Sequence, residues 1–78
     1  MDLFALGHVW LLRPCSDGST KYVCFRPALD SVEVVEVYHL PPQMPLIKRR
    51  KWLHSAEVPH CKRQLEMLQG FKHGQPLF

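Results

Sequence analysis

The sequence predicts an α+β fold, in which a three-stranded antiparallel β-meander (an N-terminal hairpin plus a third strand) packs against one C-terminal helix. Three observations lead to this prediction. An Asp-Gly pair separates two segments of β-forming residues, a Val-rich segment follows them, and apolar residues recur at helical spacing near the C-terminus. The 78 residues are expected to form a single small domain, 1–78, too short for two cofactor-binding halves or a deep substrate cleft.

The predicted hairpin spans residues 8–26. Asp17-Gly18 favours a two-residue type I′ turn, in which both central residues take positive φ. That turn sets the cross-strand pairs on the core side, which are Trp10 with Phe25 and Leu12 with Val23. The other side of the hairpin, which a single helix leaves open, is expected to carry Leu11, Arg13, Tyr22 and Cys24.

A third strand is predicted over residues 31–40, where valines alternate with acids. The alternation breaks at Val34-Val35, so either a bulge shifts the phase or both faces of the strand are covered. The bulge is favoured because burial of an unpaired glutamate is costly. Residues 41–45 contain three prolines, which cannot donate to a ladder, and are predicted to form a stiff, largely extended connector.

The pattern leaves residues 46–53 undecided between a short strand and a helical turn. A helix is then predicted to begin near Val58–Pro59, because proline suits the first helical position. Gly70 suits the residue that follows a helix, and residues 72–78 are expected to form a flexible tail. One apolar stripe faces the sheet, made of Val58, Cys61, Leu65, Leu68 and Phe71.

A cluster of cations follows the connector. Residues 46–78 hold seven of the ten Lys and Arg residues but two of the seven Asp and Glu residues, an asymmetry that often marks contact with something acidic. Adjacent cations release counterions from a phosphate backbone, and a neighbouring Trp stacks on an unpaired base. The sequence therefore predicts a small non-catalytic regulatory or accessory module whose basic segment 48–52 contacts nucleic acid or another polyanion, through Lys48, Arg49, Arg50, Lys51, Trp52, Lys62 and Arg63.

The basic run has other interpretations. It is typical of a solvated face that keeps a small protein soluble, with Trp52 in the core, and it would also suit an acidic protein surface. The alternative function is that of a protein–protein interaction factor, which docks through an edge strand or through the open face that carries Leu11, Arg13, Tyr22 and Cys24. Because so short a chain buries little core, a second copy would also suit that face, as a homodimer.

Neither an enzymatic activity nor a cofactor, metal or small-molecule substrate is predicted. Nucleophilic catalysis needs a Cys or Ser beside an oriented His, whereas Cys61 falls on the predicted buried stripe. The Cys and His residues lack two closely spaced ligand pairs, and the four glycines form no phosphate-binding loop.

A cytoplasmic location without membrane contact is expected. The N-terminus carries Asp2 where a secretory signal carries Lys or Arg, and no apolar run approaches the ~18 residues of a membrane span. Three irregularly spaced cysteines do not form a disulfide framework.

Four short motifs lie within residues 9–71: Trp10-Leu11, Cys24-Phe25-Arg26-Pro27, Pro45-Leu46-Ile47-Lys48-Arg49-Arg50 and Gly70-Phe71. Together they resemble a family of small, uncharacterised proteins of marine picocyanobacteria, known as a domain of unknown function. The resemblance implies a cyanobacterial cytoplasm and a lineage-specific accessory or regulatory role, and it implies no activity.

Overall fold

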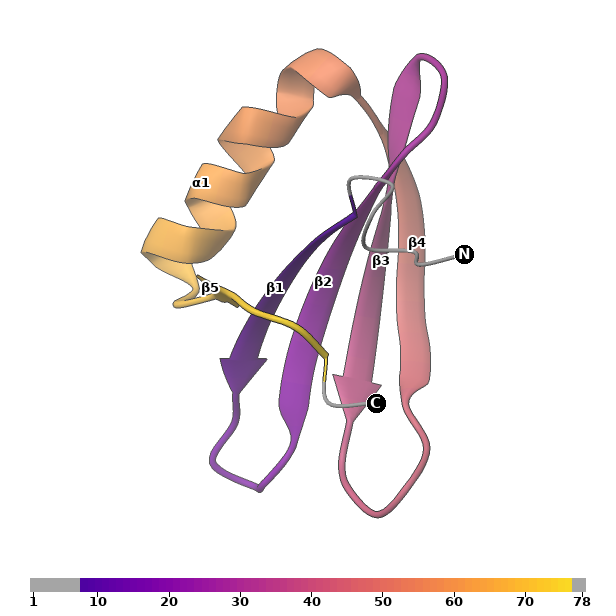
Figure 1. The fold of residues 1–78 in the computed structure, drawn as a ribbon. Helices are drawn as coiled ribbons and strands as arrows, with labels where there is room; N and C mark the ends of the chain where they lie inside the picture. The colour runs from indigo at the N-terminus through magenta and orange to yellow at the C-terminus, as the bar shows by residue number, and fades with distance from the viewer. Residues whose placement is uncertain (1–7, 77–78) are drawn as a thin grey trace.

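The computed structural model describes residues 8–76, which form a five-stranded antiparallel sheet and one C-terminal helix (Figure 1). The α+β class is as predicted, but the expected three-stranded sheet is two strands too small. The strand order is β4-β3-β2-β1-β5. The strands are β1 (Val9–Pro14), β2 (Thr20–Pro27), β3 (Ser31–His39), β4 (Leu46–His54) and β5 (Lys72–His73).

The two additional strands lie at the two edges of the sheet. The undecided segment 46–53 is strand β4, which pairs with β3 after a turn closed by the Gln43 amide donating to the Leu40 carbonyl at 2.9 Å. The prolines of residues 41–45 therefore belong to a hairpin turn and not to an extended connector; the Pro41-Pro42 bond is cis. Proline is tolerated there because the turn lies outside the ladder.

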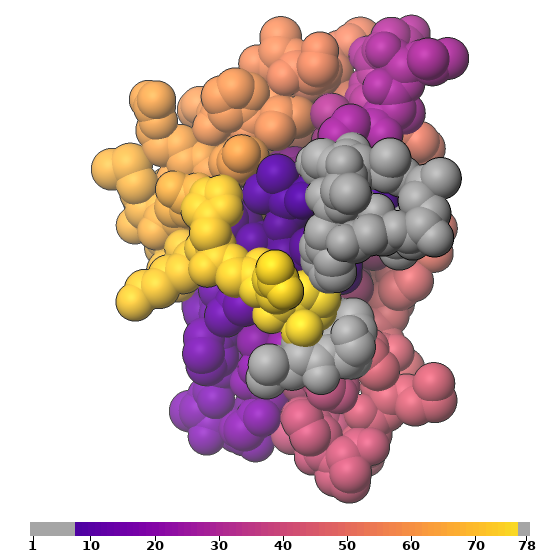
Figure 2. Space-filling view, in the orientation of Figure 1, coloured from indigo at the N-terminus to yellow at the C-terminus, as the bar shows by residue number. Residues whose placement is uncertain are grey.

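Strand β5 replaces the first part of the predicted flexible tail. Lys72 and His73 pair with Leu12 and Leu11 of β1, and the C-terminal segment lies against β1 in the space-filling view (Figure 2). The ladder between β1 and β5 orders these two residues because it satisfies backbone groups that would otherwise face solvent. The last two residues of the predicted tail, 77–78, lie outside the described residues. The same holds for residues 1–7, which carry the prediction that there is no secretory signal.

The register of the first hairpin differs by one residue from the prediction. Among the residues of its turn only Gly18 has positive φ (+88°), and the connection spans residues 15–19, with the Cys15 amide donating to the Ser19 carbonyl at 2.8 Å. A longer loop with one left-handed glycine replaces the two-residue turn. Because side chains alternate along a strand, the one-residue shift exchanges the two faces of β1 relative to β2, so that Leu11 pairs with Val23 and Trp10 with Cys24.

Strand β3 is regular where a bulge was favoured. It pairs with β2 without a register shift through Val34 and Val35, and both valines are buried, on opposite faces of the sheet. The second of the two sequence interpretations, burial of both faces, is therefore correct. Glu33 is tolerated because it forms ion pairs with Arg26 (3.4 Å) and Arg50 (3.7 Å).

The helix α1 (Val58–Leu68) begins and ends as predicted. A short 3-10 turn η2 (Ser55–Glu57) leads into it, Pro59 lies in its first turn, and Gly70 follows it with φ +74°. Val58, Cys61 and Leu65 pack against the sheet, but Leu68 is 78% exposed, because the chain turns back after Gln69 and places Phe71 in the core instead.

The core occupies both faces of the sheet. On the face that α1 covers, it contains Leu11, Val23, Phe25, Val32, Val34 and Phe71. On the opposite face, it contains Tyr22, Cys24, Val35 and Val37. Full burial of a side chain such as that of Phe25 stabilises the fold by about 1.5–3 kcal/mol.

Candidate functional site

The cations of β4 divide between the two faces of the sheet. Val34 pairs with Lys51 and Glu36 with Arg49, whereas Val37 pairs with Ile47, so that Lys48 is the extra residue of a β-bulge. The bulge places Lys48 and Arg49, which are adjacent in sequence, on the helix side together with Lys51. The four cations of the basic run therefore do not share one direction.

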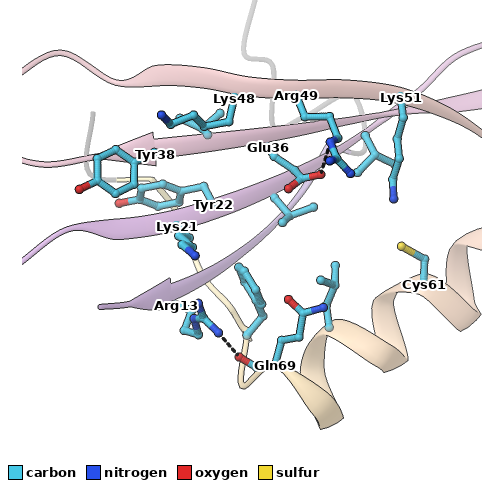
Figure 3. A pocket seen from close by; sticks show the side chains of 15 residues that line it. Arg13, Lys21, Tyr22, Glu36, Tyr38, Lys48, Arg49, Lys51, Cys61 and Gln69 are labelled. Carbon is cyan, nitrogen blue, oxygen red and sulfur yellow. Dashed lines mark hydrogen bonds and ion pairs between the residues drawn. The ribbon is translucent and has the colours of Figure 1, made fainter. Parts of the chain in front are cut away.

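A cavity of about 460 Å³ opens beside α1 on this face (Figure 3). The helix follows the end of β4 and runs toward β5, which pairs with β1 at the other edge of the sheet (Figure 1). Five cationic side chains from three strands line the cavity: Arg13, Lys21, Lys48, Arg49 and Lys51.

Two of these cations have a fixed neighbour. The Arg13 guanidinium donates to the Gln69 carbonyl at 3.1 Å and lies 5.4 Å from the centroid of the Phe71 ring. The Lys48 ammonium lies 5.5 Å from the centroid of the Tyr38 ring. Cation–π contacts of this kind orient a charge without supplying a counter-charge, so neither contact provides an acidic partner at the cavity.

Among residues 8–76, Glu36 is the one acidic residue that lines the cavity. Its carboxylate lies 3.9 Å from Arg49, at the limit of an ion pair, and both side chains are substantially exposed. The side chains of Lys21 and Lys51 form neither an ion pair nor a hydrogen bond with another residue of the described range 8–76. The cavity therefore carries a clear positive excess, with two ammonium groups free to meet an anion.

The opposite face of β4 carries Arg50 and Trp52. Arg50 pairs with Glu33, and Trp52 lies directly opposite Glu33 in the ladder and is 60% exposed. The predicted combination of four cations with a stacking Trp is thus separated by the sheet. The alternative that places Trp52 in the core is also wrong.

The remaining predicted contact residues lie outside the cavity. Lys62 and Arg63 are on α1 and do not line it. Lys21 was missed by the sequence analysis, and Arg13 was assigned to a different surface. Arg13 and Lys21 are direct cross-strand partners in the first hairpin. A prediction with the observed turn of residues 15–19 would have placed both on the same face of the sheet as Val23.

The surface expected for the alternative function does not form. Leu11, Tyr22 and Cys24 are 0%, 1% and 2% exposed. Leu11 lies under α1, whereas Tyr22 and Cys24 belong to the core on the other face. The register shift explains the correction, because it moves Leu11 to the helix side and leaves only Arg13 of the four at a surface.

Of the three cysteines, Cys24 is buried, whereas Cys15 and Cys61 are half-buried. Burial raises the pKa of the Cys24 thiol to about 11, which disfavours the nucleophilic thiolate. Cys61 lines the cavity, and Cys15 lies in the first hairpin turn. Residues 8–76 contain no group of three or more His, Cys, Asp or Glu side chains arranged to hold a metal ion.

Comparisons with protein-family models, curated proteins and solved structures found no match to this chain. The resemblance to the picocyanobacterial family therefore stays a prediction. The helix within residues 8–76 is too short and too polar to cross a membrane.

Proposed function

We propose that this protein is a small non-catalytic binding module that holds nucleic acid through the cationic cavity between α1 and the sheet. One observation supports the proposal most directly: Arg13, Lys21, Lys48, Arg49 and Lys51 come from three strands and converge on one cavity. A solubility function would require charges only to be dispersed. Convergence of five cations around one acid concentrates the positive potential that a phosphate backbone recognises.

The edge position of β4 adds to this arrangement. An edge strand that is exposed along most of its length gives a long, extended ligand access to the cavity from outside the sheet. Because Lys21 and Lys51 have no anionic partner among the described residues, phosphates can meet them without breaking an existing ion pair. Binding is then mainly electrostatic and falls steeply with salt.

The test compares two double variants that remove the same charge. Lys21→Ala with Lys51→Ala alters the cavity, and Lys62→Ala with Arg63→Ala alters α1 outside it. We expect the first pair to reduce the slope of log K against log salt concentration by about 2, one for each lost phosphate contact. The second pair is expected to leave the slope nearly unchanged. The measurement is the fluorescence anisotropy of an end-labelled oligonucleotide titrated at several salt concentrations.

An equal loss in both double variants would contradict the proposal, because binding would then follow net charge and not the cavity. Absence of oligonucleotide binding by the unaltered protein at low salt would contradict it as well. Circular dichroism of each variant excludes unfolding as the cause of a loss.

A second candidate function rests on β4 as an open sheet edge. We propose as the alternative partner an extended acidic segment of another protein, which would add a strand beside β4 and oppose its cations. Pairing of two β4 strands would place like charges opposite each other, which disfavours a homodimer through this edge. Protection of β4 amide protons from exchange by a Glu-rich peptide, but not by an oligonucleotide, would favour this candidate.

A further inference from the structure

The cavity has a charged rim and an apolar floor. The rim carries the five cations, and the apolar floor is made of Cys61 and Leu65, which are half-buried, and of the core residues Val23, Val34 and Phe71, which are at most 5% exposed. In Figure 3, Lys48, Arg49 and Lys51 extend from one strand on one side of the cavity, while Cys61 of α1 and the Arg13–Gln69 hydrogen bond lie on the other side. Phosphates alone would need the rim, so the floor indicates a ligand with an apolar part as well.

We propose that the cavity receives one unpaired base of a single-stranded nucleic acid, while the flanking phosphates contact the rim. This inference rests on the proposed function. The cavity volume of about 460 Å³ lies within the range of small-ligand sites, which run from ~300 to ~1,000 Å³. A base presents flat apolar faces to the floor and is joined to a phosphate on either side, so its chemistry matches both parts of the cavity.

The flat groups needed for base stacking are present at the cavity. Tyr38 and the planar guanidinium of Arg13 both line it, and bases in single strands stack on groups of these two kinds. Trp52 lies on the opposite face of the sheet and has no part in this contact.

The geometry of the cavity also predicts a preference for single-stranded over double-stranded nucleic acid. A duplex presents its phosphates on the outside and can meet the rim cations. Its bases are paired and stacked, and extrusion of one of them costs a few kcal/mol. The floor therefore contributes to affinity only when the base is already unpaired, and the cavity selects single strands over duplexes.

The experiment compares three ligands with the same number of phosphates per strand: a single-stranded oligonucleotide, the same strand without bases, and the duplex. Anisotropy of an end label is the readout. We expect the base-bearing single strand to bind roughly 5- to 150-fold more tightly than the abasic strand, the range for stacking of one base. The duplex is expected to bind less tightly than the base-bearing single strand, because its bases are paired.

Equal affinity for the base-bearing and abasic strands would overturn this inference and leave the proposed function standing. Binding of none of the three would overturn both. Tighter binding of the duplex than of the single strand would overturn the inference, because it would show that the rim alone recognises the ligand.

Alkylation of Cys61 locates the base. In a Cys15→Ser variant, Cys61 is the accessible thiol, because Cys24 is buried and its pKa is raised. At saturation we expect the base-bearing strand to slow alkylation of Cys61 several-fold more than the abasic strand does. The same alkylation rate with both strands would overturn placement of the base in this cavity.

Discussion

Strands β3 and β4 are neighbours of equal length with opposite characters. Each has nine residues, and β3 carries five buried residues divided between its two faces, whereas β4 is exposed along nearly its whole length. Strand β3 lies between β2 and β4 inside the sheet, while β4 forms its edge. The valines of β3 therefore contribute to both halves of the core, and the cations of β4 remain available to a ligand.

Core packing and an exposed charged surface are thus assigned to separate, adjacent strands. A charged edge also discourages unwanted pairing with other chains. The helix face shows the contrast, because Val34 and Lys51 are partners in the ladder, yet Val34 is 1% exposed and belongs to the core, whereas the Lys51 side chain is exposed at the rim of the cavity. Substitutions at these two positions should consequently have different effects.

The largest expected effect comes from Val34→Asp, with Lys51→Asp as its matched control. The first substitution buries an unpaired carboxylate between the sheet and α1, and we expect it to lower the free energy of unfolding by at least about 4 kcal/mol. A chain of this length has a total of only about 4–12 kcal/mol. Lys51→Asp should cost less than about 1 kcal/mol, because the side chain is exposed, while it weakens oligonucleotide binding. Urea denaturation measures both.

Similar destabilisation by the two substitutions would show that β4 is part of the folding core. Normal folding of Val34→Asp would contradict the assignment of Val34 to the core, because it would place this side chain in contact with solvent.

A pH titration extends the comparison to Cys24, the partner of Val35 on the other face of the sheet. Burial raises the pKa of this thiol from the ordinary value of 9.0 to about 11 in the folded protein. A raised folded pKa means that the stabilising contribution is complete below pH 9 and is lost as the pH rises toward 11. We expect a loss of about 1–3 kcal/mol across this interval, measured by urea denaturation.

The control is Cys24→Ala, which removes the thiol. The unfolding free energy of this variant is expected to decline less steeply above pH 9 than that of the unaltered protein. Parallel pH profiles would contradict a raised pKa, because the remaining decline would then come from other groups that titrate in this range.

Residues with strong local conformational preferences predicted the elements beside them correctly. Most differences between the predicted and the observed fold come from pairing between strands far apart in sequence. The helix bounds followed from Pro59 and Gly70, whose conformational preferences act within one turn. Strand β5 was missed because two residues carry no periodicity and are ordered only by β1, far away in sequence. The register error came from one turn, since Asp17 keeps negative φ and accepts hydrogen bonds from the amide and hydroxyl groups of Ser19.

The candidate site shows the same limit. The basic run was visible in sequence, but its division between two faces required knowledge that residues 46–53 form a strand and that a bulge lies at Lys48. Lys21 and Arg13 join the site only through the hairpin register, so no local pattern identified them. Charge composition therefore predicted a basic surface, and tertiary pairing determined which cations gather at the cavity.

The smallest expected effect belongs to Trp52→Thr, on the exposed face of β4. Trp52 is 60% exposed, and threonine preserves β-propensity, so we expect the free energy of unfolding to change by no more than about 0.5 kcal/mol. Oligonucleotide affinity should also stay the same, because the sheet separates Trp52 from the cavity. Urea denaturation and the anisotropy titration measure these two quantities. A marked loss of affinity without loss of stability would move the binding surface to the face that carries Arg50 and Trp52, where the cations of the cavity would no longer explain it.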